Sequence, residues 1–329
     1  MSNKTIAKFV GLVISIIVVA VVAMSCSQAA PGDPTKVSSA ELSAEWGKPS
    51  IVGRIESKDV KESSGLAASR CQPNVFWTHN DSGDDAYIFA MDETGKDLGT
   101  FEVANAQNED WEDIAAYKDA DGTCYLYIGD TGNNKLERPE LRIYRVKEPT
   151  ISSSGSSSEE RDEKGDRDGK DERDAPSTEP AQVMSFKYQD TPHNSETLMV
   201  NQQTGDVYVL TKRLDGPSLV FKLKPSFGSS QPVIAEKVGE VSVPSVPNGL
   251  LTGGDISPDG KRVILCDYSG GYELLATSPT FDDVWKTKPV AVDLGERKHG
   301  EAIAFAADGK AIFGTNEGKR AEIFEVKLK

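Results

Sequence analysis

The chain has 329 residues, with 37 basic and 52 acidic side chains and a formal net charge of −15 at pH 7. This excess of negative charge argues against nucleic acid or an anionic membrane surface as the main binding partner. The length corresponds to about two average domains, but a closed all-β fold often reaches this size as a single unit.

Residues 1–30 have the order of features that is typical of a secretory signal. Two lysines, Lys4 and Lys8, come before an uncharged apolar run over residues 9–24, and small residues follow it. The run is shorter than the roughly 20 residues that a membrane-spanning helix needs. The sequence therefore predicts a segment that directs the rest of the chain out of the cytoplasm.

Three fates of this segment stay open. Small residues allow cleavage after Ala29, whereas the run Ala23-Met24-Ser25-Cys26 resembles a bacterial lipoprotein signal, in which Cys26 would carry the lipid. The third alternative is an uncleaved anchor. All three predict an extracytoplasmic protein, either secreted or a lipoprotein of the cell membrane. Residues 31–49, rich in Pro, Gly, Ser and charges, are expected to form a tether.

A short pattern of strands and turns occurs five times in the rest of the chain. Each copy has a strand that starts with small or acidic residues, a turn rich in Asp, Gly, Pro or Asn, a second strand that ends in polar residues, and a third strand. Self-similarity at this period is typical of the blades of a β-propeller. The copies begin with SSGLAAS (63–69), WEDIAAY (111–117), SETLMVN (195–201), GGDISPD (253–259) and GEAIAFA (300–306).

The spacing predicts an all-β fold, a single propeller of five four-stranded blades, with six blades as the alternative. The last copy ends at Lys329 with three strands, and residues 50–57 can supply the missing one. Such pairing of the two chain ends closes the ring and removes a free sheet edge. The other fourth strands are expected at residues 98–103, 181–188, 235–243 and 289–294.

Residues 150–180 interrupt the second blade between its third and fourth strands. They contain no Val, Leu or Ile after Ile151. Such a segment buries too little apolar surface to offset its ordering entropy, so we expect it to be disordered. The predicted organisation is thus a propeller over residues 50–329 with one disordered insertion.

Two cysteines, Cys71 and Cys124, fall at the first hairpin turn of adjacent blades and on the same predicted face of the ring. We expect them to form a disulfide, which an oxidising extracytoplasmic compartment permits. Two unpaired thiols are the alternative.

In a propeller, the loops before the inner strands and after the second strands emerge on one face around the central channel. Acidic residues gather there, at the starts of the inner strands. Calcium takes about six to eight oxygen ligands, so these carboxylates predict a bound calcium ion. The expected metal ligands are Glu112, Glu196, Asp255 and Glu301.

Further polar residues of the same loops are candidates for binding a ligand. They are His79, Asn80, Asp81, Asp113, Asp130, Lys212, Asp267, His299 and Asn316. The alternative is that these side chains are only solvated or hydrogen-bonded to neighbouring loops, as polar groups in any wet channel are. The chain contains no motif of a serine hydrolase with a nucleophile elbow or of a zinc protease.

Several motifs resemble those of known propeller families. The block PNGLLTGGDISPDGKRVILCD (247–267) is similar to a pattern of SMP-30/gluconolactonase propellers. The motifs ESSGLAAS, THNDSG and DWEDIA resemble those of secreted SdiA-regulated and esterase-like-phytase propellers. Together with IGDTGNN they resemble more closely a family of uncharacterised bacterial secreted or lipoprotein propellers. The SMP-30 resemblance implies a divalent metal in the channel, with Glu62 and Asn248 at two of the ligand positions.

These observations predict an extracytoplasmic, membrane-anchored propeller that binds a ligand or partner on its channel face through a central calcium ion. The expected partners are a small molecule or a component of the cell envelope, and the membrane only through the N-terminal anchor. The first alternative is a metal-dependent hydrolase of the phosphoesterase or lactonase type that uses the same acidic channel. The second is a structural scaffold of the cell envelope.

Overall fold

The computed structural model describes residue 43, residues 45–151, residue 173 and residues 175–329. The predicted signal over residues 1–30, with Cys26, lies outside the described residues, as do most of the tether and of the insertion. Among the described residues, no helix combines the length and the apolar character that crossing a membrane requires.

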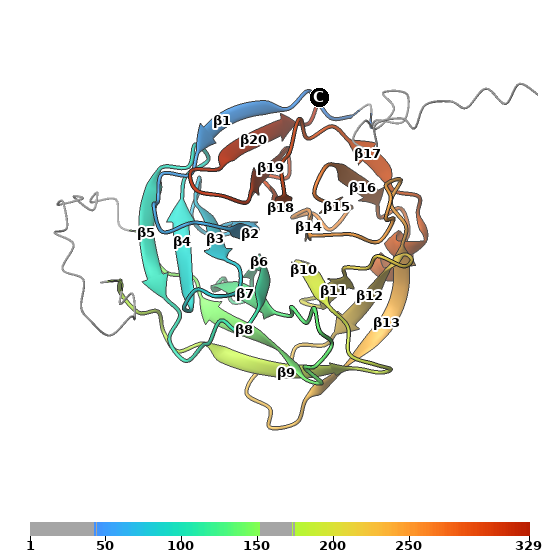
Figure 1. Cartoon of the computed structure of the whole chain (residues 1–329), viewed down its shortest axis with the longest axis horizontal. Coiled ribbons are helices and arrows are strands. Elements are labelled where there is room, and N and C mark those ends of the chain that lie inside the picture. Colours follow the sequence, from blue (N-terminus) through green and yellow to red (C-terminus); the bar gives the residue numbers. More distant parts are fainter. Residues whose placement is uncertain (1–42, 44, 152–172, 174) are drawn as a thin grey trace, which may run out of the picture. The chain divides into compact units, whose positions relative to one another are not determined.

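The described part contains twenty strands, and strands that follow one another along the chain pair antiparallel in groups of four. The first two groups are β2 (Ser63–Ala68), β3 (Phe76–Asn80), β4 (Tyr87–Met91), β5 (Asp97–Glu102), and β6 (Trp111–Lys118), β7 (Cys124–Asp130), β8 (Leu141–Lys147), β9 (Gln182–Tyr188). The next two are β10 (Ser195–Val200), β11 (Val207–Thr211), β12 (Ser218–Leu223), β13 (Val233–Val241), and β14 (Gly253–Ile256), β15 (Arg262–Cys266), β16 (Gly271–Leu275), β17 (Val290–Val292). The groups lie radially around a common centre, which is the arrangement of a β-propeller (Figure 1).

The last sheet joins the two ends of the described chain. It contains β18 (Gly300–Phe305), β19 (Ala311–Asn316), β20 (Glu322–Lys327) and, outermost, β1 (Ser50–Arg54). The strands β1 and β20 are antiparallel, with Ser50 opposite Glu325. The predicted closure of the ring by the N-terminal strand is confirmed, and the pairing holds the first strand of the propeller against the last.

The outer strands of two predicted blades share hydrogen bonds. The strands β9 and β13 run parallel, with Phe186 opposite Val233, so the second and third predicted blades form one eight-stranded sheet. This pairing covers two sheet edges that would otherwise be exposed. The hydrogen bonds thus give one eight-stranded and three four-stranded sheets in the described residues, and the count of five blades stays a prediction.

The end of the predicted insertion lies against the first sheet. The backbone N–H of Thr178 donates to the carbonyl oxygen of Glu102 at 2.8 Å, and that of Ala181 donates to Ala104 at 2.8 Å. Residues 175–180 therefore line the outer edge of β5, although the sequence places them within a disordered segment. The backbone groups of an edge strand explain this docking, because they can bind any neighbouring extended chain regardless of its side chains.

The inner strands β2, β6, β10, β14 and β18 surround the centre of the ring (Figure 1), and nearly all their residues are buried. Neighbouring sheets pack face to face. Trp77 and Ile88 of the first sheet, for example, share one apolar cluster with Trp111 and Ile128 of the second. Burial on both faces explains why the strands read as continuous apolar runs.

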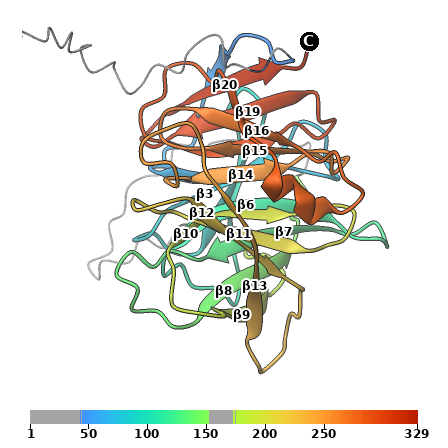
Figure 2. The ribbon, with the colours of Figure 1, turned by 90° about the vertical axis from the view of Figure 1, so that its right-hand side faces the viewer.

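Two features tie or cover the outside of the ring. A disulfide joins Cys71, in the β2–β3 turn, to Cys124 at the start of β7, with the Cα atoms 6.1 Å apart. The short 3-10 helix η2 (Phe281–Lys286) lies on the outer surface (Figure 2) and buries Trp285 against β13 and β16.

Candidate functional site

Three carboxylates meet at the channel face, and we call them the acidic cluster. They belong to Asp81, which follows β3, to Asp110, which precedes β6, and to Glu112 in β6. One ligand oxygen from each lies within 4.8 Å of the other two, which is close enough for all three to hold one cation. Asp81 and Glu112 are predicted functional residues, whereas Asp110 is not among them.

A glycine makes room for this cluster. A Cβ atom on Gly132, in the loop after β7, would lie 2.2 Å from Oε1 of Glu112 and 2.3 Å from Oδ2 of Asp110. Its own N–H donates to the carbonyl oxygen of Asp110 at 3.1 Å. The DWEDIA and IGDTGNN motifs are thus parts of one site, because the second supplies the space that the carboxylates of the first occupy.

The glutamates of the inner strands stand at irregular positions of the sheet. In β6 the pairing shifts between Trp111 and Asp113, which leaves Glu112 as an extra residue. Glu196 in β10 and Glu301 in β18 stand at the same kind of shift. A β-bulge re-aims a side chain relative to the regular pleat. The three shifts therefore place an irregularity at or beside each of the equivalent glutamates; in β18 it falls between Gly300 and Ile303.

The carboxylates strongly influence one another. Burial raises the pKa of Glu112 well above its usual range, and the charges of Glu196 and Asp81 raise it further. Burial, with Glu196 and Glu317, raises the pKa of Glu301 to about 9. A site that keeps several buried carboxylates this close is unfavourable for anions and favourable for a cation.

One cation of the chain lies beside these acids. Nζ of Lys212 forms an ion pair with Glu196 at 2.5 Å and donates to the hydroxyl of Tyr268 at 2.6 Å. Burial lowers the pKa of Lys212, but the charge of Glu196 outweighs this effect, and the net shift is upward. Lys212 therefore neutralises Glu196, and the acidic cluster is left with Arg138, whose charge lowers the pKa of Asp110 although burial raises it more.

The donor set fits a hard divalent cation. Carboxylate oxygens are the ligands that calcium prefers, and three of them already converge. A nearby acid offers one more oxygen, because Oε2 of buried Glu301 has no hydrogen-bond partner among the described residues. Calcium would be held by Asp81, Asp110 and Glu112, and its charge would relieve the repulsion among them.

Asp255 lies in different surroundings from the other predicted metal ligands. Its Oδ2 accepts from the backbone N–H of Phe305 at 2.9 Å and forms an ion pair with Arg70 at 3.3 Å. Asp113 makes the equivalent contact, since its Oδ2 accepts from the N–H of Leu198 at 2.9 Å. Asp255 thus joins β14 to β18, and Asp113 joins β6 to β10. Because this is a packing role, we leave Asp255 out of the site.

Several predicted ligand-binding residues make hydrogen bonds or ion pairs within the protein. Asp130 is buried and paired with Arg138 at 2.8 Å, and Asp267 accepts from the hydroxyl of Tyr272 at 2.6 Å. Asn80 accepts from the N–H of Lys61 at 2.8 Å. These contacts organise the loops around the channel, which is the structural role that the sequence left as the alternative.

The remaining predicted residues lie near the channel mouth. His79 is buried against Trp111, with ring centres 5.7 Å apart, and burial lowers its pKa. His299 packs edge-on against Tyr268 at 5.9 Å. Asn316 accepts a long hydrogen bond from Arg297 at 3.4 Å. Of this group only His299 is exposed to solvent.

The two positions that the SMP-30 resemblance implies do not belong to the acidic cluster. The amide of Asn248 donates to Oγ of Ser242 at 3.0 Å. Glu62 forms an isolated backbone bridge with Glu317. The acidic cluster, which is the candidate cation site, is therefore built from the DWEDIA and THNDSG motifs rather than from the PNG motif.

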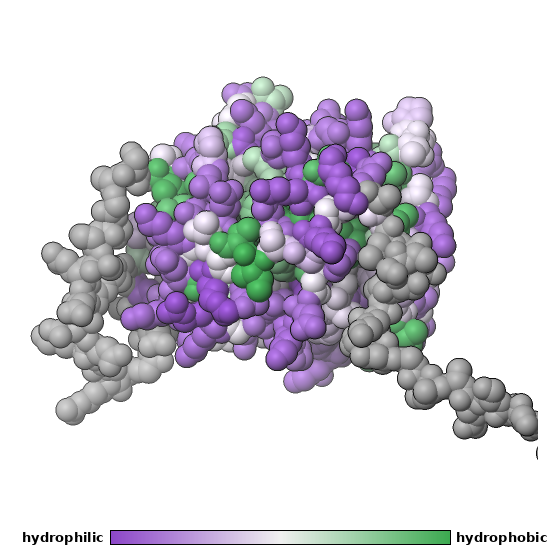
Figure 3. Space-filling model, turned by 90° about the horizontal axis from the view of Figure 1, so that it is seen from above, coloured by the Kyte–Doolittle hydropathy of each residue, from purple (hydrophilic) through white to green (hydrophobic). Residues whose placement is uncertain are grey.

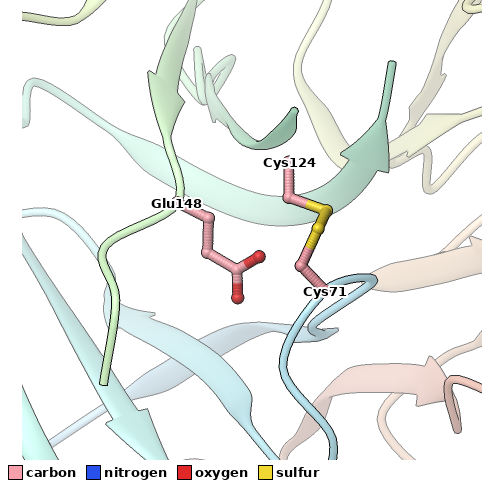
Figure 4. Close-up of side chains that lie close together, drawn as sticks. All are labelled: Cys71, Cys124 and Glu148. Atoms are coloured by element: carbon pink, nitrogen blue, oxygen red, sulfur yellow. A yellow bond between two sulfur atoms is a disulfide. The ribbon is translucent and has the colours of Figure 1, made fainter. Parts of the chain in front are cut away.

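A second group of possible metal ligands, Cys71, Cys124 and Glu148, has another role. The two sulfur atoms are bonded to each other, so neither is a thiolate that could bind a metal (Figure 4). Glu148 accepts hydrogen bonds from Nε1 of Trp77 at 2.8 Å and from Gln72 at 2.9 Å. This group therefore connects the first and second sheets.

Comparison with known proteins supplies only distant likeness. No family model and no curated protein matches the chain. Similar solved structures include a gluconolactonase from Xanthomonas campestris, with 13% identity and a TM-score of 0.45, over 88% of this chain and 97% of that one. Another, solved by a structural genomics consortium as a candidate gluconolactonase, has 10% identity and a TM-score of 0.42, over 88% and 94%. At these values the likeness carries no argument about activity.

Proposed function

We propose that this propeller binds a divalent cation, calcium in the first instance, in the acidic cluster of its channel face. The observation that carries the proposal is the convergence of Asp81, Asp110 and Glu112 within 4.8 Å, in a space that Gly132 leaves open. Three carboxylates would supply only part of the about six to eight oxygen ligands that calcium takes. A small molecule or an envelope partner with oxygen ligands would bind at the remaining positions.

A melting-temperature scan tests the cation site. Calcium, magnesium, manganese and zinc are added in turn to the full chain, with EDTA as the reference. A ligand that binds only the folded state at 100 times its Kd stabilises it by about 2.7 kcal/mol, so calcium should raise the Tm measurably. The shift should be absent from Asp110→Asn and unchanged in Asp308→Asn, an exposed aspartate on a distant turn. No shift with any divalent ion would overturn the proposal.

The second candidate function is a metal-dependent hydrolase of phosphoesters or lactones. The observation in its favour is Glu301, whose raised pKa keeps its carboxyl group protonated at neutral pH beside the acidic cluster. A protonated carboxyl can act as a general acid toward a leaving group. Under this function, Glu112→Gln and Glu301→Gln would remove nearly all turnover of a phosphoester or lactone panel while the protein stays folded.

A binding protein would behave differently in the same experiment. It would show no turnover with the wild type, and its ligand affinity would fall gradually as single carboxylates are replaced. If neither metals nor small molecules change the melting temperature, the structural scaffold is the remaining function. Turnover and ligand affinity of the variants, together with the melting-temperature scan, therefore separate the three classes of function.

We also propose that the protein acts outside the cytoplasm, anchored by a lipid on Cys26. The order of residues in the N-terminal segment and the bonded pair Cys71–Cys124 support this location. Membrane fractions should contain the wild-type chain, and Cys26→Ser should abolish incorporation of a labelled fatty acid. A mature mass that begins at residue 30 would instead indicate cleavage after Ala29, and an intact N-terminus would indicate an uncleaved anchor.

A further inference from the structure

A cavity of ≈640 Å³ lies at the outer side of the closing sheet, apart from the acidic cluster. It is bounded by β1, β20, the loop before β18 and the loop between β19 and β20. Its volume lies within the range of about 300–1,000 Å³ that is usual for small-molecule sites. Its location was not expected from the sequence, because the side chains that line it come from separate segments of the chain.

One part of the cavity wall is apolar. Ile51 on β1 is 63% exposed, and the edges of Leu294 and Phe324, which are only 3% and 5% exposed, form the floor of the same space. Figure 3 views the molecule from the side of β1 and β20 and shows a hydrophobic patch surrounded by polar surface. An exposed apolar patch with a polar rim is typical of a binding site.

The rim of the cavity carries cations without acidic partners. Lys298, Lys319 and Arg320 line the cavity, and none of them makes an ion pair or a side-chain hydrogen bond with another described residue. Three such cations close together are unusual in a chain whose net charge is −15. Arg320 also has a φ of 55°, and non-glycine residues in this region are often found at functional sites.

The acids that line the cavity do not cancel this charge. Glu322 is paired with Arg54. Glu296 and Glu317 face Lys298, Lys319 and Arg320 across the cavity. Counting Arg54 and Glu322 as well, the described lining residues include four cations and three acids, so cations are in excess.

We propose that this cavity binds a small organic anion, a carboxylate or phosphate attached to an apolar body. The apolar body would lie on Ile51, Leu294 and Phe324, and the anionic group would be held by Lys298, Lys319 and Arg320. Arginine and lysine side chains are the usual partners of carboxylate and phosphate groups. Because these cations are exposed, the affinity falls as the ionic strength rises.

The test compares three probes that share one apolar body. Binding of 4-phenylbutyrate, 4-phenylbutylamine and 4-phenylbutan-1-ol to the full chain is measured by isothermal titration calorimetry. The carboxylate should bind saturably and at least about tenfold more tightly than the other two. Equal binding of all three, or no saturable binding of the carboxylate, would overturn the proposal.

Matched variants locate the site. Lys319→Glu and Arg320→Glu should each weaken binding of 4-phenylbutyrate by about tenfold, and Ile51→Ala by a smaller factor. Lys118→Glu makes the same change of charge at an exposed lysine at the end of β6 and should leave the Kd unaltered. An equal effect of Lys118→Glu on the Kd would show that affinity depends only on the net charge of the protein, and this would contradict the proposal.

An arm with EDTA separates this site from the acidic cluster. A carboxylate could also bind to a cation held in the channel. If the rim cations hold the probe, EDTA and Asp110→Asn leave its Kd unchanged. Loss of binding in either case would show that the probe binds to a metal ion in the channel. That result would overturn the inference about the cavity, whereas the proposed cation site would stand.

Discussion

Gly132 lies against the carboxylate of Glu112, and a Cβ atom at this glycine would come within 2.2 Å of Oε1. Glu112 belongs to β6 and Gly132 to the loop after β7, and the absent side chain of the glycine creates the space for the charged group of the glutamate. The closest atoms are the ends of flexible side chains, so a larger residue would displace the carboxylates rather than the backbone.

Gly132→Ala should therefore remove the calcium-dependent rise in melting temperature and change the stability of the metal-free protein little. Displaced carboxylates can no longer converge on one cation. Gly270→Ala is the matched control, since a Cβ there meets its nearest atom at an ordinary 3.4 Å. An unchanged calcium response in Gly132→Ala would show that the acidic cluster is not the cation site.

The stability of the metal-free protein should fall as the pH rises from 6.5 to 9. The pKa of Glu301 is about 9 in the folded protein, above that of an unfolded glutamate, so the folded state holds this proton more tightly. The resulting stabilisation is complete below the unfolded pKa and is lost as the pH approaches the folded one. The raised pKa of Glu112 acts in the same direction.

Melting temperatures in EDTA over this range check the prediction. Burial lowers the pKa of His79, so this residue makes stability rise with pH in the acidic range. The comparison therefore begins at pH 6.5. Glu301→Gln should flatten the profile. Added calcium should stabilise more at high pH, because its ligands must be deprotonated. A melting temperature that is flat or rises with pH in EDTA would contradict the prediction.

Loss of the disulfide between Cys71 and Cys124 should destabilise the protein by about 2–4 kcal/mol, as a cross-link over a long loop does. The sequence separation of 53 residues encloses β3, β4 and β5 of the first sheet and β6 of the second. Urea denaturation of the double variant Cys71→Ser/Cys124→Ser measures the effect. Dithiothreitol should lower the urea midpoint of the wild type to that of the double variant, and it should leave the midpoint of the double variant unchanged.

Arg70→Met should destabilise the protein by about 3–5 kcal/mol, because it leaves a buried carboxylate without its cation. The side chains of Arg70 and Asp255 are only 6% and 10% exposed. Lys286→Met breaks the exposed pair with Asp283 and should leave the urea midpoint nearly unchanged. Adding Asp255→Asn to Arg70→Met should recover part of the loss in urea denaturation, and further destabilisation would contradict the explanation.

The acidic site shows where reasoning from the sequence succeeds and where it ends. Glu112, Glu196 and Glu301 stand at the same position of the repeat, and the structure gives each the same irregular pairing. Asp255 stands one residue later in the repeat, beside Asp113. Since successive side chains of a strand point to opposite sides, this offset is enough to move Asp255 from the site to the packing between inner strands.

By itself the sequence determined the all-β repeat, the pairing of the N-terminal strand with the last sheet, and the face on which acids gather. The repeat and its acidic face follow from patterns within about 50 residues, because apolar strands and polar turns recur locally. The pairing of the chain ends follows from the strand that the last copy of the repeat lacks. Only the tertiary structure decided that Asp110 and Gly132 belong to the acidic cluster, that β9 pairs with β13, and that a cationic cavity lies beside β1. Each of these depends on contacts between segments distant in sequence, whose distances no local pattern specifies.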